Sequence, residues 1–427
     1  MIDINFLREN VELVKENMVK KFKADKVDLV DKAVELDDLR RKYIVEGDAL
    51  RKRKNEIADE IAKLYASKQG DKAEPLKEES KSISETLKEI EEKEEENKKE
   101  FKTVMLSIPN IMHESVPVGE SDEFNVETAK YGEPVVPDFE IPYHVEILEK
   151  VGGIDLDSAR EVAGSGFYYL DGDIARLQSA ILSYARDFMI EKGFEYTIPP
   201  FMMRGNIVEG VMSFKEMDEM MYKIEGEDLY LIGTSEHTMI GRYINKILDE
   251  EKMPILKTSY SPCFRKEKGS HGIEERGIYR VHQFEKQEMI VICKPEDSWE
   301  LYEKLWKNTV ELFRSMEIPV RTLEICSGDL ADLKAKSCDV EAWSPRQKKY
   351  FEVGSCSNLT DAQARRLGIR IKGEKGIYLA HTLNNTVVAP PRMLIAFVEN
   401  HLNEDGSINI PEALRPYMGN KTKIEVK

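Results

Sequence analysis

Hydrophobic residues recur every seven positions over most of the first hundred residues. The first series consists of Leu29, Leu36, Tyr43, Leu50, Ile57 and Leu64. After "SKQGDKAEP" a second series contains Leu76, Ile83, Ile90 and Val104, with Leu87 and Phe101 in the seam and Asn97 as a polar position. A repeat of this length predicts two coiled-coil helices. The short break predicts that they are antiparallel, because a tight turn brings the second helix back along the first.

From about residue 125 the pattern changes to mixed helix and strand. Amphipathic helices are predicted over 172–194, 295–317 and 390–402, and strand-like stretches over 228–236, 255–267, 279–292 and 348–358. Strands that follow one another with few crossover helices favour an antiparallel sheet flanked by helices. Between the two regions, "SIPNIMHESVPVGESDEFN" contains Pro109, Pro117 and Gly119, which break a helix. We therefore predict an α+β chain of two domains, 1–110 and 111–427.

Composition excludes several classes of protein. The 427 residues carry a formal net charge of −17, which argues against indiscriminate binding to nucleic acid but leaves room for a local basic face. No apolar run approaches the roughly 18–20 residues of a membrane span, and "MIDINFLREN" has no apolar secretory core. The five cysteines form no CxxC pair. We expect reduced thiols, no structural zinc and a cytoplasmic location.

Positive charge is concentrated on the first helix of the hairpin. "RRK" occupies residues 40–42 and "RKRK" residues 51–54, whereas the second helix carries "EEKEEENKKE" at 91–100. One interpretation is an ordinary solvated coiled-coil surface. The other is an arm whose basic side lies along a phosphate backbone and positions a nucleic acid without reading its bases.

Mixed charges and aromatic rings also alternate in "FRKEKGSHGIEERGIYRVHQFEKQE", residues 264–288. This segment fits either a solvated hairpin or a site for a polyanion that carries an aromatic base. The chain contains neither GxxxxGK[ST] nor GxGxxG, so a nucleotide site here is neither a P-loop nor a Rossmann site.

Several blocks, in order, resemble the motifs of class II aminoacyl-tRNA synthetases, and more narrowly those of the seryl-tRNA synthetases. "GFEYTIPPFMMR" is similar to motif 1, "FRKE…YRVHQFEKQE" to motif 2 and "HTLNNTVVAPPRMLIAFVEN" to motif 3. "TSE" at 234–236 and "FEVGSCSN" at 351–358 resemble the serine-specific blocks. The resemblance runs to about Gly419. It implies a helical tRNA-binding arm in 1–110 and a class II catalytic core in 111–427.

The activity that this resemblance implies is ATP-dependent ligation of L-serine to tRNA(Ser) through seryl-adenylate, with AMP and pyrophosphate released. Arg265 and Arg392 would be the catalytic residues. The implied ATP-binding set is Arg265, Lys266, Glu267, Arg280, Val281, Phe284, Glu352, Val353, Gly354, Ser355 and Arg392. Glu352 and Ser355 would supply oxygen ligands to Mg²⁺. Because Glu267 lies two positions after Arg265, a strand through both would turn them to the same side.

Serine recognition is implied for Thr234, Ser235, Glu236, Arg265, Glu288, Asn384 and Thr386. The loop "KGSHGIEERG" would reach the acceptor end of tRNA, and the arm residues expected at tRNA are Arg40, Arg41, Arg51, Arg53 and Lys54. Ala389, Pro390 and Pro391 stand where many relatives carry glycines, and we expect Arg392 to keep its place. The family also implies a homodimer through motif 1, with Pro200 at the interface. Selenocysteine tRNA, tRNA(Sec), is a further expected partner.

Two other functions fit the same core. One is an amino-acid:carrier-protein ligase of the same lineage, against which the long hairpin counts. The other is a catalytically inactive paralogue that serves as a binding protein, against which the set of Arg265, Glu267, Glu288, Glu352 and Arg392 counts.

Overall fold

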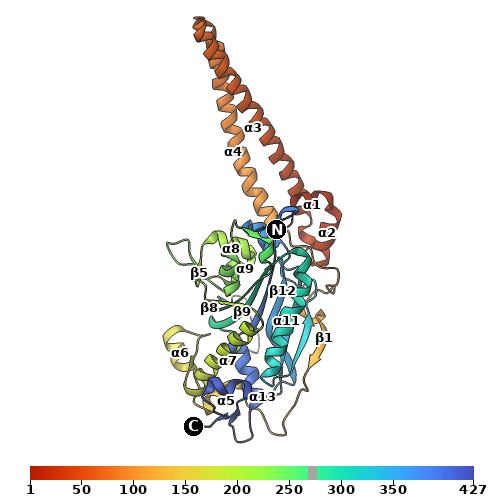
Figure 1. Cartoon of the computed structure of the whole chain (residues 1–427), viewed down its shortest axis with the longest axis vertical. Coiled ribbons are helices and arrows are strands. Elements are labelled where there is room, and N and C mark those ends of the chain that lie inside the picture. Colours follow the sequence, from red (N-terminus) through yellow and green to blue (C-terminus); the bar gives the residue numbers. More distant parts are fainter. Residues whose placement is uncertain (268–276) are drawn as a thin grey trace. The chain divides into compact units, whose positions relative to one another are not determined.

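The computed structural model describes residues 1–267 and 277–427 (Figure 1). The chain divides into two compact units. One consists of Met1–Val19 with Lys23–Pro109, and the other of Lys20–Phe22 with Asn110–Lys427. Apart from Gly277, the loop expected to reach the acceptor end of tRNA lies outside the described residues. Within them, no helix combines the length and the apolar content that crossing a membrane requires.

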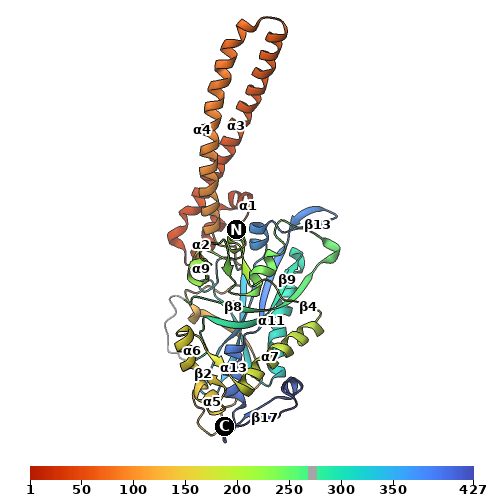
Figure 2. The ribbon, with the colours of Figure 1, turned by 90° about the vertical axis from the view of Figure 1, so that its left-hand side faces the viewer.

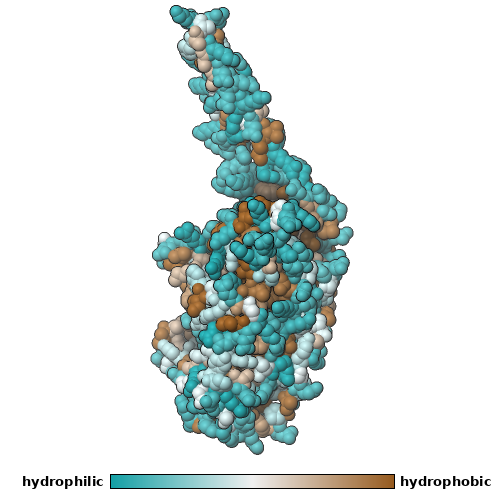
Figure 3. All heavy atoms as spheres, in the orientation of Figure 1, coloured by the Kyte–Doolittle hydropathy of each residue, from teal (hydrophilic) through white to brown (hydrophobic). Residues whose placement is uncertain are grey.

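The first unit confirms the predicted hairpin of long helices. Its helices are α1 (Ile4–Glu9), α2 (Val11–Lys20), α3 (Asp28–Ala66) and α4 (Glu74–Ser107). Helices α3 and α4 run side by side in opposite directions (Figure 2). The heptad residues are buried or half-buried between the helices. The surface of the hairpin that faces the viewer in Figure 3 is mainly hydrophilic. Asn97 is buried in the seam, and its amide has no hydrogen-bond partner among the described residues.

The second unit is built on an eight-stranded sheet in the order β1-β10-β11-β12-β15-β9-β8-β4. Neighbouring strands are antiparallel except at the edge, where β4 pairs parallel with β8, so the antiparallel core predicted from the sequence is confirmed. The strands are β1 (Val126–Tyr131), β4 (Glu195–Thr197), β8 (Ile255–Phe264), β9 (Gln283–Cys293), β10 (Val320–Glu324), β11 (Lys336–Ser344), β12 (Lys349–Asn358) and β15 (His381–Val388).

Three long helices pack against this sheet: α7 (Gly172–Glu191), α11 (Ser298–Ser315) and α13 (Pro390–His401). Helix α7 ends at Glu191, three residues before the predicted end, because Gly193 adopts a φ of 88° just beyond it. The remaining helices and strands are short. They are α5 (His144–Lys150), β2 (Ile154–Asp155), α6 (Leu156–Ala163), β3 (Tyr169–Leu170), β5 (Met202–Met203), α8 (Gly205–Val211), α9 (Phe214–Met220), β6 (Tyr230–Leu231), α10 (Ser235–Gly241), β7 (Ile247–Asp249), α12 (Ala362–Leu367), β13 (Arg370–Gly373), β14 (Gly376–Leu379), β16 (Ile408–Asn409) and β17 (Lys423–Ile424).

Strand β9 is buried on both faces at its C-terminal end. Met289 and Val291 belong to one hydrophobic cluster, with α7, α11 and α13. Ile290 and Ile292 belong to a second cluster, with α8, α10 and α12. Toward the start of β9, residues of the second face become polar. The sheet therefore offers a polar surface beside a well-packed core, and this surface positions the site.

One strand prediction is wrong. The stretch 228–236 contains only the two-residue strand β6, and Ser235 begins helix α10. Thr234 ends the extended segment because its hydroxyl accepts a hydrogen bond from the backbone N–H of Glu236, at 3.3 Å. The "TSE" block therefore lies at a helix N-terminus.

Candidate active site

Two cavities lie side by side over the polar end of β9. The smaller cavity has a volume of about 300 Å³. It is lined by all of the predicted ATP-site residues except Lys266 and Ser355, namely Arg265, Glu267, Arg280, Val281, Phe284, Glu352, Val353, Gly354 and Arg392. Lys266 lies outside both cavities, with its ammonium 6.0 Å from the Tyr222 ring. Most of the predicted nucleotide site therefore converges on one cavity.

The larger cavity has a volume of about 390 Å³. All but one of the predicted serine-site residues line it: Thr234, Glu236, Arg265, Glu288, Asn384 and Thr386. Ser235 is the exception, since it is buried and its hydroxyl donates to the backbone carbonyl of Ser259, at 3.4 Å. Ser355 lines this cavity rather than the smaller one.

Four residues line both cavities and so mark their junction: Arg265, Lys286, Glu352 and Thr386. The motif resemblance implies roles for three of them but none for Lys286. The signal that could have found it is its position in β9, between Phe284 and Glu288 on the same side of an alternating strand.

The local geometry of Arg265 differs from the prediction. Strand β8 ends at Phe264, and Glu267 adopts a φ of 48°, so the argument that one strand turns Arg265 and Glu267 to the same side is wrong. Both nevertheless reach the smaller cavity. The Arg265 Nε donates to the carbonyl of Gly233 at 3.1 Å, and its guanidinium lies 5.3 Å from the centre of the Phe284 ring. These contacts fix the guanidinium without a strand.

Arg280 is also placed differently from the prediction. It precedes β9, which begins at Gln283, rather than lying on the returning strand. Its guanidinium donates to the Glu267 carboxylate at 3.2 Å. This ion pair joins the two ends of the motif 2 segment at the smaller cavity.

Arg392 lies in the first turn of α13, where two prolines begin the helix, and it lines the smaller cavity as expected. Its guanidinium donates to the Glu352 carboxylate at 2.8 Å and lies 4.8 Å from the centre of the Tyr279 ring. The Arg392 charge holds the pKa of Glu352 below its ordinary value, against the opposing effect of burial. Glu352 is therefore ionised near neutral pH.

A third carboxylate, which sequence reasoning missed, stands beside Glu352 and Ser355. Asp339 on β11 is directly opposite Ser355 on β12. Burial, and then the charge of Glu352, raise the pKa of Asp339 to about 8. Its Oδ1 is buried and has no hydrogen-bond partner among the described residues. No sequence motif marks this residue, because the pairing of β11 with β12 alone brings it to the site.

These oxygens fit a magnesium ion that is completed by a substrate. Carboxylate and hydroxyl oxygens suit Mg²⁺, which typically takes one or two carboxylates and fills its shell with phosphate and water. In the described part of the chain, no group of three or more His, Cys, Asp or Glu residues could hold a metal alone. Glu352 and Ser355, with Asp339 nearby, thus match a cation that arrives with a polyphosphate.

Two further carboxylates lie in the larger cavity. Glu288 Oε1 accepts a hydrogen bond from the Thr234 hydroxyl at 2.7 Å and forms an ion pair with Lys286. Glu236 Oε1 accepts one from the Gln363 amide at 2.7 Å. Burial, and then the charge of Glu288, raise the pKa of Glu236 to about 7. The cavity therefore offers negative charge for a ligand that carries an ammonium group.

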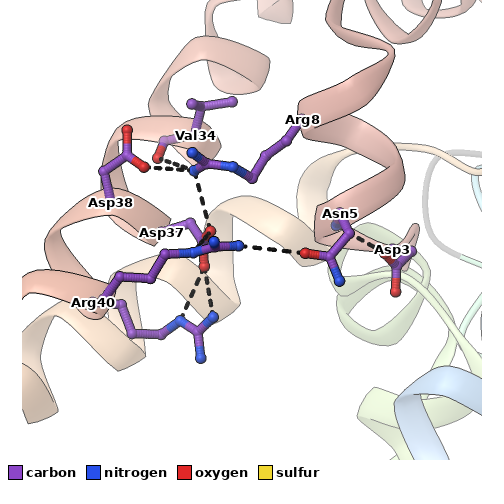
Figure 4. Close-up of polar contacts among 8 residues, drawn as sticks. Asp3, Asn5, Arg8, Val34, Asp37, Asp38 and Arg40 are labelled. Atoms are coloured by element: carbon purple, nitrogen blue, oxygen red, sulfur yellow. Dashed lines mark hydrogen bonds and ion pairs between the residues drawn. The ribbon is translucent and has the colours of Figure 1, made fainter. Parts of the chain in front are cut away.

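The predicted basic residues at the base of the arm are engaged with one carboxylate (Figure 4). Asp37 is fully buried and accepts hydrogen bonds from Arg8 at 3.2 Å, Arg40 at 2.6 Å and Arg41 at 2.8 Å. Arg41 also donates to Asn5 at 3.3 Å. This cluster ties α1 to α3, and it holds the guanidinium groups of Arg40 and Arg41 in fixed positions.

The basic residues farther along α3 are also paired. Arg51 contacts Asp48 and Glu91. Arg53 makes a two-pronged contact with Glu79 on α4, at 2.8 and 3.0 Å. No ion pair is found for Lys54 within the described ranges. The arm's basic face is thus partly neutralised, as its composition indicates.

Comparison with known proteins gives matches along the whole chain. Residues 1–112 match the family model "Seryl-tRNA synthetase N-terminal domain", and residues 220–401 match "tRNA synthetase class II core domain (G, H, P, S and T)". The serine–tRNA ligase of Pyrococcus furiosus is 44% identical, and that of Thermococcus sibiricus 41%; each alignment covers 100% of this chain and 98% of the relative.

Two solved structures have the same fold over the full chain. One is the seryl-tRNA synthetase from Pyrococcus horikoshii complexed with ATP, with a TM-score of 0.93 and 41% identity, covering 100% of both chains. The other is the cytoplasmic serine–tRNA ligase from Naegleria fowleri in complex with AMP, with a TM-score of 0.88 and 34% identity, covering 100% of this chain and 99% of the other. The chain therefore belongs to the seryl-tRNA synthetase family of class II aminoacyl-tRNA synthetases.

Proposed function

We infer that this chain is a serine–tRNA ligase, which joins L-serine to tRNA(Ser) with ATP as the energy source. The observation that carries this inference is the pair of cavities that meet at Arg265, one with nucleotide-site residues and the other with carboxylates and hydroxyls. The serine carboxylate attacks the α-phosphate of ATP, which gives seryl-adenylate and pyrophosphate. The seryl group then passes to the terminal ribose of tRNA, and AMP leaves.

The residues of the smaller cavity suit binding and orientation of ATP. Arg265 lies at the junction, where its planar guanidinium can contact the α-phosphate and the serine carboxylate together. Phe284 offers a face to adenine, and Arg392 offers a cation to the far end of the triphosphate. Glu352 and Ser355 would hold Mg²⁺, which neutralises phosphate charge when bound. Fixed cations of this kind stabilise the charge that moves onto phosphate in the transition state.

The larger cavity suits serine. Glu288 and Glu236 can accept hydrogen bonds from its ammonium group, while Thr234, Asn384 and Thr386 offer partners to its hydroxyl. A cavity that hydrogen-bonds a substrate hydroxyl rejects the analogue that lacks it, because buried polar groups are then left unpaired. Alanine should accordingly be a poor substrate.

Amino-acid-dependent ATP–pyrophosphate exchange tests this function. With Mg²⁺ present, we expect exchange with serine and at least about 100-fold less with alanine at equal concentration. Equal or greater exchange with alanine or threonine would overturn the assignment of serine as the substrate. Absence of exchange with every amino acid would favour the inactive paralogue. The match of residues 1–112 to a seryl-tRNA synthetase N-terminal domain counts against the carrier-protein ligase.

The helical hairpin is proposed as the tRNA-binding arm. Its hydrophobic seam is satisfied between α3 and α4, and the other unit is a compact body of its own, so we expect that unit to stay folded when residues 30–100 are deleted. The truncated protein should keep serine-dependent pyrophosphate exchange but charge tRNA(Ser) poorly. Charging at the full-length rate would contradict the role of the arm. In a host that has tRNA(Sec), which is first charged with serine, we expect this tRNA to be a second substrate.

We further propose that the protein is a cytoplasmic homodimer that uses the motif 1 segment as its interface. This segment includes β4 at the edge of the sheet, and Ile190, Ile198 and Pro200 around it are exposed. Exposed apolar residues beside a sheet edge are typical of a symmetric contact between copies. Sedimentation should give a dimer at micromolar concentration. A fully active monomer would contradict this proposal.

A further inference from the structure

Strand β9 arranges the two halves of the site in a line. Phe284, Lys286 and Glu288 are spaced two residues apart, so their side chains leave the same face of the strand at intervals of roughly 7 Å. Phe284 lines the smaller cavity, Glu288 the larger one, and Lys286 both. The lysine therefore stands between the positions proposed for adenine and for serine.

Lys286 and Glu288 form a buried ion pair. Their side chains are 8% and 3% exposed, and the lysine ammonium contacts Glu288 Oε1. The Thr234 hydroxyl donates to this same oxygen at 2.7 Å. The other oxygen, Oε2, is buried and has no hydrogen-bond partner among the described residues. Two donors thus hold one oxygen of the carboxylate and leave the second oxygen available to a ligand.

Stability alone does not account for such a pair. Removal of two charges from water offsets much of their attraction, so apolar residues of similar volume are often as stable. A buried carboxylate oxygen without a partner is also unfavourable unless a ligand supplies one. Glu236 lies in the same cavity, so the charge of Lys286 also offsets a second carboxylate there.

We propose that Lys286 is a positioning residue for the amino-acid substrate. It holds Glu288 through Oε1, together with Thr234, so that Oε2 is turned to the ammonium group of serine. Lys286 acts through Glu288, whereas Arg265 contacts the reacting groups themselves. This inference rests on the proposed function, and it predicts an effect on serine binding rather than on ATP binding.

The test is pyrophosphate exchange by the full-length protein, with serine and ATP varied separately. For Lys286→Met we expect the KM for serine to rise at least about tenfold, as loss of one partner of a buried charge pair does. The KM for ATP should change less than about threefold. Lys286→Arg should restore most of the serine affinity, because it returns a cation to the carboxylate. Loss of a lysine with a purely structural role would not raise the KM for serine while leaving the KM for ATP nearly unchanged.

Lys336→Met is the matched control. Lys336 lies on β11, is 15% exposed and pairs with Glu324 at 3.4 Å, but it lines neither cavity. This variant should keep the KM for serine and the KM for ATP within about twofold of the wild-type values. An unchanged serine KM in Lys286→Met, or a loss confined to ATP binding and kcat, would overturn the inference. The latter would show that Lys286 acts on phosphate instead.

A double variant, Lys286→Met with Glu288→Gln, distinguishes a positioning role of Lys286 from a general folding defect. If Lys286 acts through Glu288, Lys286→Met should raise the serine KM less than about twofold further in the Glu288→Gln background. The inference would be contradicted if the increase in serine KM in the double variant equals the product of the two single increases. This holds even if both single variants bind serine more weakly. Thermal unfolding of each variant establishes that it is folded. If the wild-type protein shows no serine-dependent exchange, the proposed function itself fails, which is a separate result.

Discussion

The guanidinium of Arg392 donates to both the carboxylate and the backbone carbonyl of Glu352, at 2.8 and 3.2 Å. The residue proposed to hold the triphosphate is therefore the partner of the residue proposed to hold Mg²⁺. ATP with its metal would bring phosphate to Arg392 and the cation to Glu352, the two partners of this ion pair. Affinity for Mg²⁺ and affinity for ATP should accordingly be linked through these two side chains.

The first prediction concerns Glu352→Gln. The amide keeps the shape of the side chain but has no charge for the cation, so the Mg²⁺ concentration for half-maximal exchange should rise at least about tenfold. A magnesium titration of exchange measures it. Glu341→Gln is a matched control, because Glu341 lies on the adjacent strand, pairs with Arg321 and lines neither cavity. An unchanged magnesium requirement in Glu352→Gln would contradict the proposed metal site.

The second prediction concerns Arg265→Ala. Loss of a preorganised donor to the reacting phosphate should slow exchange by about 100- to 1,000-fold, or about 3–4 kcal/mol. The loss should appear in kcat at saturating serine and ATP. Arg160→Ala, which removes an exposed arginine paired with Asp157, serves as the control. Near-normal exchange by Arg265→Ala would refute its catalytic role.

The sequence predicts the long hairpin and the antiparallel sheet because both are fixed by local periodicity. Heptad spacing identifies α3 and α4, and alternating residues identify β9 and β12. Loop conformations are harder to predict. Glu267 reaches its cavity through a positive φ rather than through a strand, and Thr234 turns the chain into a helix. The motif resemblance names both residues, and each lines one of the two cavities, although the periodicity does not place them there.

The residues that sequence reasoning missed depend on pairing between distant segments. Asp339 comes to the site because β11 pairs with β12 in a register that sets it opposite Ser355. Gln363 reaches Glu236 across 127 positions of the chain. Lys286 belongs to motif 2, and its spacing from Phe284 and Glu288 places it on the same face of the strand, but its position between two cavities follows only from the assembled sheet. Such contacts are properties of the assembled sheet.

The third prediction concerns pH and Glu236. Its pKa is raised to about 7 in the folded protein from an ordinary value near 4.5. Between these values the unfolded chain has released the proton while the folded protein keeps it, so stability falls as pH rises. Over the whole pH range between the two pKa values, the free energy of unfolding should fall by about 3 kcal/mol. Denaturant unfolding of the wild type and of Glu236→Gln at pH 4.5 and pH 7.5 should show a loss of stability that is larger in the wild type by about this amount.

The difference between the two proteins isolates Glu236 from groups that titrate in the opposite direction. Burial lowers the pKa of His144 and His237 to about 3, which makes stability rise with pH over part of the same range. Both histidines are present in the wild type and in the variant, so their contribution cancels. Parallel pH profiles for the two proteins would show that Glu236 does not titrate in this range.

The fourth prediction compares two adjacent aspartates in the first unit. Asp37 is fully buried among three arginines (Figure 4), whereas Asp38 is 57% exposed and, among the described residues, pairs with Arg8 alone. Asp37→Asn should destabilise the first unit by about 2–3 kcal/mol, a value reduced because its arginines are partly exposed. Asp38→Asn should cost less than about 1 kcal/mol. Hydrogen exchange in α1 and α3 of the full chain measures both, and equal effects would contradict the role of Asp37.

The last prediction separates charge from structure on the arm. Arg53 on α3 is a proposed tRNA contact, but it also bridges to Glu79 on α4, so Arg53→Glu alone would remove a cation and break this bridge. The double variant Arg53→Glu with Glu79→Arg restores an ion pair between the same helices and moves the positive charge to α4. If tRNA contacts the cation at position 53, both variants should bind tRNA(Ser) more weakly.

The slope of log affinity against log salt should fall by about one in both variants, because one phosphate contact is lost. Serine-dependent pyrophosphate exchange should stay unchanged, since the residues proposed for it all lie in the other unit. Rescue of tRNA binding by the double variant would show that Arg53 acts through the α3–α4 bridge. The tRNA contact would then lie elsewhere on the arm, with Lys54 as the next residue to test.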